Sequence, residues 1–301
     1  MTIEIKSDQT EPVAARPTQL SRIAPIVSVR DLRKTWITPD GKNIALDGVS
    51  FDVYPGEVAA IVGPSGAGKT TVLRIVAGLL EATSGTTEVT GALVKGPPKG
   101  VAMVFQDYSR SLLPWLSVLG NVTLPMRSNG VNKKEALERA RHALASVGLA
   151  GKEKIHPRLL SGGMQQRVAI ARALAFQPTL LLMDEPFASV DAQTRMDLED
   201  LVIPLRDEYG VTILFVTHDI DEAIYLSDRV ISLTSPPSVV GEIVEVHLPT
   251  PRTQVATKKH PEFSRLREHV LSLVRSTPNS VSAQSPIAKS DTTNEESTWA
   301  S

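Results

Sequence analysis

The chain has 301 residues, which is enough for one large domain or two small ones. Its 22% charged and 42% hydrophobic residues are typical of a soluble globular protein, and its formal net charge of −1 argues against bulk electrostatic binding to nucleic acid or anionic lipid. The absence of cysteine excludes disulfides, zinc sites built on cysteine and a thiol nucleophile.

The two ends of the chain differ in composition from its middle. Residues 1–25 carry acidic residues and prolines without an apolar run, so we expect a flexible leader that is neither a secretory signal nor a transit peptide. Residues 276–301 are rich in Ser, Thr, Asn, Pro and Glu, which predicts a disordered tail. No run of 18 apolar residues occurs, so any membrane role must go through a partner.

The first predicted strands lie at residues 26–33, where apolar and polar residues alternate loosely, and at residues 44–53, where they alternate over the second half. We expect them to pair in antiparallel fashion around a turn at residues 38–41. Trp36 precedes this turn. It is either a partly exposed packing aromatic or a ring that stacks on a nucleotide base, and the loop that follows favours stacking.

A phosphate-binding loop is predicted between a buried strand at residues 58–62 and a helix at residues 72–80. Glycines let the backbone approach a ligand, so that successive N–H groups and the positive end of the helix face phosphate oxygens. Lys69 would neutralise the β- and γ-phosphates, and the Thr70 hydroxyl would ligate Mg²⁺. The residues assigned to the nucleotide in this loop are Gly63, Pro64, Ser65, Gly66, Ala67, Gly68, Lys69, Thr70 and Thr71.

The segment after this loop contains a short apolar strand at residues 101–105, which ends at Gln106. Residues 109–115 form a predicted loop with exposed apolar side chains. Those side chains are Leu112, Leu113, Pro114 and Trp115. A helix is predicted at residues 132–147, with Asn132 as its N-cap.

Residues 160–167, which read LSGGMQQR, open another predicted helix, which continues with Val168, Ala171 and Leu174 on one side. Ser161 is a natural N-cap, and Gly162 and Gly163 leave N–H groups accessible to an anion. By itself this octet is equally compatible with a well-capped helix that binds nothing.

Polar side chains follow two more predicted strands. The strand at residues 180–183 leads into Asp184 and Glu185, and the strand at residues 211–216 precedes His218. Because ligands bind beyond the carboxyl ends of the strands in α/β sheets, we expect these side chains to converge with the loop lysine and the glutamine. Burying acidic groups without a cation is costly, so Mg²⁺ or a polar site is expected there.

The remaining predicted elements are peripheral. Strands are expected at residues 230–233 and 242–246, on either side of turn residues 235–238. A closing helix is expected at residues 261–275 because its apolar residues recur at helical spacing. No internal repeat of 20 to 50 residues is visible.

Together these motifs resemble the ATP-binding subunit of an ABC transporter, over about residues 26–275. The motifs in the family's order are the phosphate loop at 63–70, the glutamine loop at Gln106, the signature at 160–167, the second nucleotide motif at 180–184 followed by Glu185, the aspartate loop at 188–191 and the switch histidine His218. Ala188 stands where many members have Ser, which leaves the role of Asp191 in place, and Trp36 stands where members usually carry Tyr or Phe. Residues 112–115, 184–187, 218–223 and 261–263 resemble the nitrate, sulfonate and taurine importer subgroup.

The resemblance implies an α/β fold with a P-loop NTPase (RecA-like) core built on a parallel sheet. It also implies an antiparallel β subdomain and a helical subdomain at about residues 107–160, all within one ATP-binding domain at 26–275. Two copies would dimerise head to tail, with each ATP between the phosphate loop of one copy and the signature of the other. The signature contacts would come from Ser161, Gly162 and Gly163, and Asp191 is counted among the nucleotide-binding residues.

The resemblance also assigns catalytic roles. Glu185 would orient or deprotonate the attacking water, and His218 would contact the γ-phosphate and hold the water and Glu185 in place. The metal would be held by Thr70 and Asp184, together with Gln106. Gln106 would also report metal and γ-phosphate occupancy to the helical subdomain.

The predicted function is therefore that of an ATP-hydrolysing subunit that energises a membrane importer, for a small oxyanion such as nitrate, an aliphatic sulfonate or taurine. Expected partners are permease subunits docking near residues 112–115, where Trp115 has a core position as its alternative reading, and indirectly a periplasmic or extracellular substrate-binding protein. The chain would lie peripherally on the cytoplasmic face of the cell membrane.

The alternatives are a soluble ABC ATPase acting in nucleic-acid repair or translation and an exporter subunit. The short stretch between Gln106 and Ser161, the single nucleotide domain and the lack of a basic stripe weigh against nucleic acid.

Overall fold

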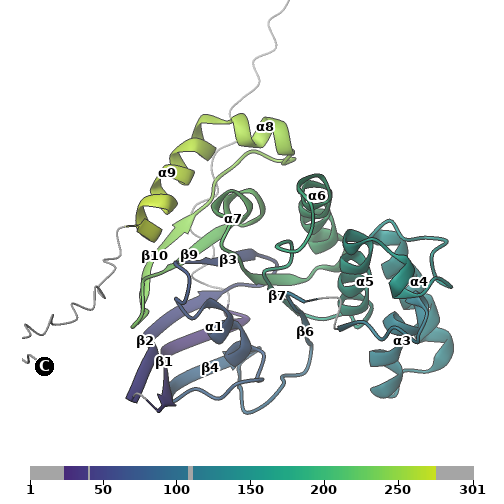
Figure 1. Cartoon of the computed structure of the whole chain (residues 1–301), viewed down its shortest axis with the longest axis horizontal. Coiled ribbons are helices and arrows are strands. Elements are labelled where there is room, and N and C mark those ends of the chain that lie inside the picture. The colour runs from purple at the N-terminus through teal and green to yellow at the C-terminus, as the bar shows by residue number, and fades with distance from the viewer. Residues whose placement is uncertain (1–23, 40, 108–110, 276–301) are drawn as a thin grey trace, which may run out of the picture.

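The computed structural model describes residues 24–39, 41–107 and 111–275 (Figure 1). The predicted tail at 276–301, residues 108–110 and all of the predicted leader except residues 24 and 25 lie outside the described residues. Within the described residues, no helix is both long and apolar enough to cross a membrane.

A six-stranded sheet forms the centre of the described chain. Its strand order is β10-β9-β3-β8-β7-β6. The bounds of these strands are β3 Val58–Val62, β6 Val101–Val104, β7 Leu180–Asp184, β8 Thr212–Val216, β9 Arg229–Leu233 and β10 Val240–Glu245. All neighbours pair in parallel except β10, which is antiparallel to β9. The predicted parallel core is confirmed.

The central strands are apolar along their whole length because both faces of the sheet are covered. Every residue of β3, β7 and β8 is buried. Ala59 and Ile61 point to one face, where α1 (Lys69–Val76) packs, whereas Val58 and Ala60 point to the face covered by helices of the second half of the chain. Alternation along one strand thus divides the protein into two hydrophobic clusters.

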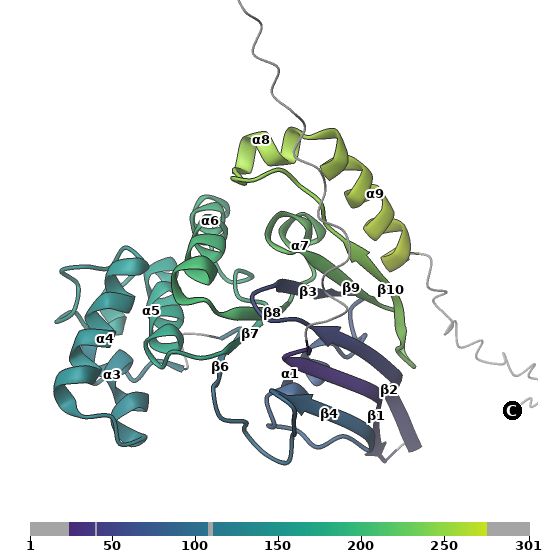
Figure 2. The same ribbon diagram turned by 180° about the vertical axis from the view of Figure 1, so that it is seen from behind.

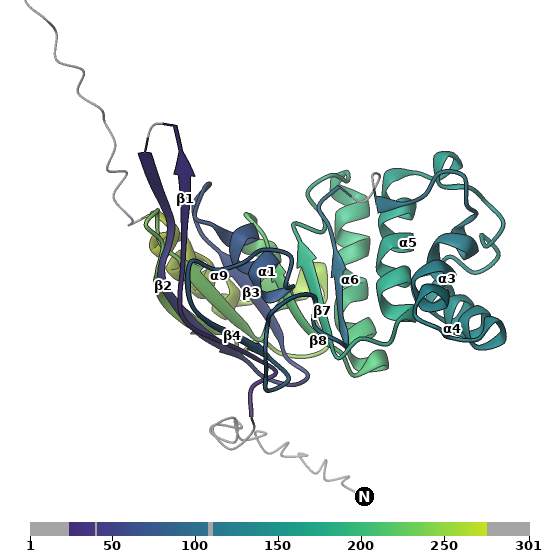
Figure 3. The ribbon, with the colours of Figure 1, turned by 90° about the horizontal axis from the view of Figure 1, so that it is seen from below.

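The predicted antiparallel β subdomain is present as a four-stranded sheet, and this sheet packs on the α1 face. Its strand order is β2-β1-β4-β5. The bounds are β1 Val27–Thr38, β2 Gly41–Val53, β4 Ser84–Val89 and β5 Ala92–Leu93. β1 and β2 form a long hairpin that projects from the body of the protein in Figure 3.

A helical lobe lies at the opposite end of the protein (Figure 1). It consists of α3 (Val118–Ser128), α4 (Lys133–Ser146) and α5 (Gly162–Ala175), which pack on one another. The predicted N-cap of α4 is present, since Asn132 accepts a hydrogen bond of 2.9 Å from the Glu135 N–H. Ala136, Ala140 and Leu144 form the buried stripe of α4.

The second half of the chain covers the other face of the sheet with helices (Figure 2). These are α6 (Ala192–Tyr209), α7 (Ile220–Leu226), α8 (Gln254–Lys259) and α9 (Pro261–Arg275). α9 has the bounds predicted from sequence and buries Phe263, Leu266 and Val270.

Two local expectations are wrong. The helix after the phosphate loop ends at Val76 and does not reach residue 80, because Gly78 turns the chain with φ +66°. A Cβ on Gly78 would lie 2.1 Å from the Gly96 carbonyl oxygen, so the turn packs directly against backbone. Leu112, expected to be exposed, is only 3% exposed and belongs to the core, whereas Trp115 is 71% exposed.

Candidate functional site

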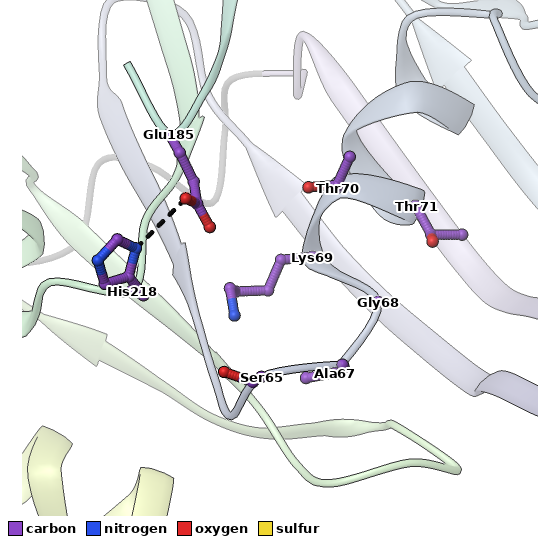
Figure 4. A pocket seen from close by; sticks show the side chains of 9 residues that line it. Ser65, Ala67, Gly68, Lys69, Thr70, Thr71, Glu185 and His218 are labelled. Atoms are coloured by element: carbon purple, nitrogen blue, oxygen red, sulfur yellow. Dashed lines mark ion pairs between the residues drawn. The ribbon is translucent and has the colours of Figure 1, made fainter. Parts of the chain in front are cut away.

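An open pocket of about 600 Å³ lies over the start of α1 (Figure 4). Its volume is in the range of small-molecule sites. The residues that line it are Ser65, Gly66, Ala67, Gly68, Lys69, Thr70, Thr71, Glu185 and His218. The pocket therefore combines the predicted phosphate loop with two side chains from distant strand ends.

The backbone of the loop leaves the start of α1 open to an anion. Gly66 and Gly68 have φ of +81° and +76°, a region that favours glycine. Gly68 is the N-cap of α1 and has no side chain with which to cap the first N–H groups of the helix. A Cβ on Gly68 would lie 2.7 Å from Leu46 Cδ2, so the loop also packs closely against β2. These N–H groups and the helix dipole suit a phosphate.

Lys69 is held inside the loop and is only 8% exposed. Its Nζ donates hydrogen bonds to the carbonyl oxygens of Gly63 at 2.8 Å and Pro64 at 3.0 Å. Burial lowers the pKa of Lys69, and the carboxylates of Glu185 and Asp184 oppose this effect. A phosphate in the pocket would offer this ammonium a charged partner in place of two carbonyls.

Thr70 and Asp184 bring two oxygens together at the base of the loop. The Thr70 hydroxyl donates a hydrogen bond of 2.8 Å to the Asp184 carboxylate, which is 3% exposed. Burial raises the pKa of Asp184, and the hydrogen bond from Thr70 opposes the rise. A hydroxyl beside a carboxylate fits Mg²⁺, which takes few protein ligands and otherwise binds phosphates and water. No group of three or more acidic, histidine or cysteine side chains that could hold a metal occurs among the described residues.

Glu185 is where three strand ends meet. One oxygen of its carboxylate, Oε2, accepts a hydrogen bond of 2.8 Å from Gln106 Nε2. The same oxygen lies 3.3 Å from His218 Nδ1, an ion pair that Figure 4 shows as a dashed line. These side chains follow β6, β7 and β8, which are neighbours in the sheet. Glu185 has φ +42°, a strained conformation for a residue with a side chain, and its N–H donates to the Val216 carbonyl.

Nine predicted site residues do not line this pocket: Gly63, Pro64, Gln106 and Asp184, whose contacts are described above, and Trp36, Ser161, Gly162, Gly163 and Asp191. Trp36 is 40% exposed on β1, with the Lys34 ammonium 4.5 Å from its ring centroid. Ser161 caps α5 by accepting from the Met164 N–H, and Asp191 caps α6 by accepting from Thr194, whose hydrogen bonds lower the pKa of Asp191.

Sequence reasoning missed a polar network behind His218. Asp219 caps α7 and lies 3.5 Å from Arg195 of α6. Glu222, one helical turn further on, is 4% exposed, and its Oε1 has no hydrogen-bond partner among the described residues. Burial and the nearby acids Glu199 and Asp219 hold the pKa of Glu222 well above its usual range. The dense run of acids at 219–222 was the available signal.

Fold and site together define a P-loop nucleotide-binding protein. The family model described as ABC transporter matches residues 46–188. An uncharacterized ABC transporter ATP-binding protein of Methanocaldococcus jannaschii is 44% identical over 249 residues, which cover 83% of this chain and 91% of the relative. The nitrate transport protein NasD of Klebsiella oxytoca is 40% identical over 251 residues, which cover 82% of this chain and 95% of the relative.

A solved structure shares the architecture. A dimeric ATP-binding cassette in a post-hydrolysis state, bound to ADP and Pi, is 32% identical with a TM-score of 0.65, over 73% of this chain and 99% of that chain. The chain belongs to the ABC transporter ATP-binding protein family, and its expected place in the nitrate, sulfonate and taurine importer subgroup is confirmed. It binds ATP, and its enzymatic activity is ATP hydrolysis coupled to transport.

The raised pKa of Glu222 predicts a pH-dependent stability. A carboxyl whose pKa is higher in the folded than in the unfolded chain stabilises the fold fully below the unfolded value, and this contribution is lost as pH rises through the folded value. Gln at position 222 stays neutral at every pH. The thermal unfolding midpoint of Glu222→Gln should therefore increase relative to that of the wild type as pH rises from about 5 to about 9. The exposed Glu138→Gln is the control. A difference between Glu222→Gln and wild type that stays constant with pH would contradict the assignment.

Proposed function

We propose that ATP binds with its phosphates over residues 63–71 and is hydrolysed there by in-line attack of water on the γ-phosphorus. The observation that carries this proposal is the meeting of Gln106, His218 and Glu185 at one carboxylate oxygen beside the phosphate loop. Loop N–H groups and Lys69 would neutralise phosphate charge as it develops in the transition state. Pre-positioned donors of this kind are the main means by which phosphoryl transfer is accelerated.

Glu185 would act on the attacking water. Its second oxygen, Oε1, is left to accept the proton or orient the water, because Oε2 is held by Gln106 and faces His218. His218 is 62% exposed at its side chain, so its ring can reach a γ-phosphate in the same pocket. The strained backbone of Glu185 fits a residue held in place for its chemistry.

Mg²⁺ would be held by the Thr70 hydroxyl and the Asp184 carboxylate, with Gln106 as the third proposed ligand. Bound there, the ion would offset the charge of the β- and γ-phosphates. Trp36 would stack on the base, for which its half-exposed ring on the hairpin is available.

The remaining nucleotide contacts would come from a second copy. Ser161 and Gly162 are exposed and begin α5, yet they do not line the pocket of their own chain. A head-to-tail dimer would place them, with Gly163 and Asp191, against the ATP of the partner. The similarity to a dimeric cassette bound to ADP and Pi supports this arrangement.

Transport requires partners beyond the dimer. We propose that permease subunits dock around Trp115, whose exposed ring is an apolar contact surface, and that a periplasmic or extracellular substrate-binding protein acts with them. The chain would then lie on the cytoplasmic face of the membrane. A small oxyanion such as nitrate is the proposed cargo because NasD, a relative covered almost completely, is a nitrate transport protein. Nothing in the comparisons favours a nucleic-acid partner.

We retain the proposed division of the chain into one ATP-binding domain at 26–275 with a helical subdomain at about 107–160. The packing of α3 and α4 on α5 supports a helical unit that continues into the signature helix. Movement of this unit against the sheet would move residues 161–163 together with the docking surface at Trp115.

Replacement of Glu185 tests the catalytic assignment. Glu185→Gln keeps the hydrogen-bonding shape but removes the base, so kcat should fall about 10²- to 10⁴-fold while ATP affinity is retained. Steady-state ATPase assays and a fluorescent ATP-binding assay measure the two quantities, with Glu138→Gln on α4 as a surface control. Turnover at the wild-type rate would refute the role of Glu185.

Replacement of Lys69 tests the phosphate contact. Lys69→Ala removes a charged donor worth about 1.5–3 kcal/mol, so ATP affinity should fall about 10- to 100-fold. The exposed Lys134→Ala is the matched control. Equal ATP affinity of Lys69→Ala and Lys134→Ala in the same binding assay would rule the contact out.

A further inference from the structure

The first turn of α6 joins two parts of the site that the pocket itself does not join. α6 lies between α5, which begins at the signature, and α7, which follows His218 (Figure 1, Figure 2). Its N-cap is Asp191, and the first turn, residues 192–195, contacts both neighbours.

On the signature side, the contact is a close approach of Thr194 to Gly163. A Cβ placed on Gly163 would lie 2.1 Å from Thr194 Cγ2, closer than any real pair of such carbons, but 3.4 Å from Thr194 Cβ and 3.7 Å from its Oγ1. Thr194 is itself fixed, because its N–H and hydroxyl donate to the Asp191 carboxylate at 3.0 and 2.7 Å. The Thr194 methyl group of the same chain therefore leaves room only for glycine at position 163.

On the histidine side, the contact is an ion pair between Arg195 and Asp219 at 3.5 Å. Asp219 accepts from the N–H groups of Asp221 and Glu222 and donates its own N–H to Thr217 Oγ1, so it organises the turn that carries His218. Both partners of the ion pair are 33% exposed at their side chains. An ion pair of this exposure adds little to stability, so its role is to hold Asp219 in position.

We propose that the first turn of α6 is an intramolecular tie between the signature and the switch-histidine loop, with Thr194 and Arg195 as its positioning residues. The inference rests on the proposed function, in which the signature of a chain serves the partner's ATP whereas His218 serves its own. The tie then links the two nucleotide sites through a single chain. It also makes the small size of Gly163 a packing requirement within the chain, separate from any contact of its N–H with phosphate.

The signature side is tested by suppression. Gly163→Ala should lower kcat at least about tenfold, since a displacement of about 1 Å is costly in a positioned site. Thr194→Ser removes the methyl group but keeps the hydroxyl that bonds Asp191, so by itself it loosens the contact and should lower kcat less than Gly163→Ala does. The double variant Gly163→Ala/Thr194→Ser should recover to within about threefold of wild type, which is a strong coupling energy between neighbours. If position 163 matters only for phosphate contact, the double variant stays as slow as Gly163→Ala.

The histidine side is tested by the separation of kcat from KM. Arg195→Ala should lower kcat about tenfold with the KM for ATP changed by less than about twofold, and Arg195→Lys should restore part of the loss. Arg265→Ala, which breaks an exposed ion pair with Glu262 on α9, is the matched control. Circular dichroism and unfolding midpoints check that every variant is folded.

The outcomes separate this inference from the function on which it rests. If the wild type and Arg265→Ala hydrolyse no ATP, the proposed function fails. If they hydrolyse ATP and both the suppression and the Arg195 effect are absent in folded variants, the tie is refuted while the proposed function stands. Suppression together with a kcat-only effect of Arg195→Ala supports the tie.

Discussion

The organisation of this protein depends on one constraint, the order of three neighbouring parallel strands. Because β6, β7 and β8 lie side by side and end at the same edge, Gln106 and His218 reach the same carboxylate oxygen of Glu185. The next strand, β3, delivers the phosphate loop to that edge. The left-handed backbone of Glu185 is strained, and the surrounding strands hold it in this conformation, with its carboxylate toward the pocket.

The same architecture separates the site into halves. The phosphate loop belongs to the cluster formed by α1 and the antiparallel sheet, whereas the signature begins a helix of the other cluster. A chain folded in this way presents a charged loop on one surface and open helix N–H groups on another, which a second copy would bring together. Within one chain, residues at the start of α6 contact both the signature and the histidine loop.

The sequence predicted those features that depend on local pattern. Continuous apolar strands, the N-caps Asn132 and Ser161, and the order of the motifs follow from side-chain periodicity and turn chemistry. Features set by tertiary packing were missed or wrong: Leu112 looked exposed because a loop assignment says nothing of what covers it, and the end of α1 is fixed by backbone contact at Gly78. α6 was not predicted, although it is the longest helix among the described residues; Pro204 interrupts its pattern, and its face is only partly apolar. The close approach of Thr194 to Gly163 joins residues 31 apart and leaves no local signal.

The proposal that a complete site needs two copies can be tested by crosslinking, and the absence of native cysteine makes this practical. Ser65 in the phosphate loop and Ser161 at the signature are both exposed, so Ser65→Cys and Ser161→Cys place one thiol in each half of the site of a single chain. With a short bifunctional thiol reagent, we expect a covalent dimer that forms when ATP is added and is absent without it. A crosslink within one chain, or one indifferent to ATP, would contradict the proposal.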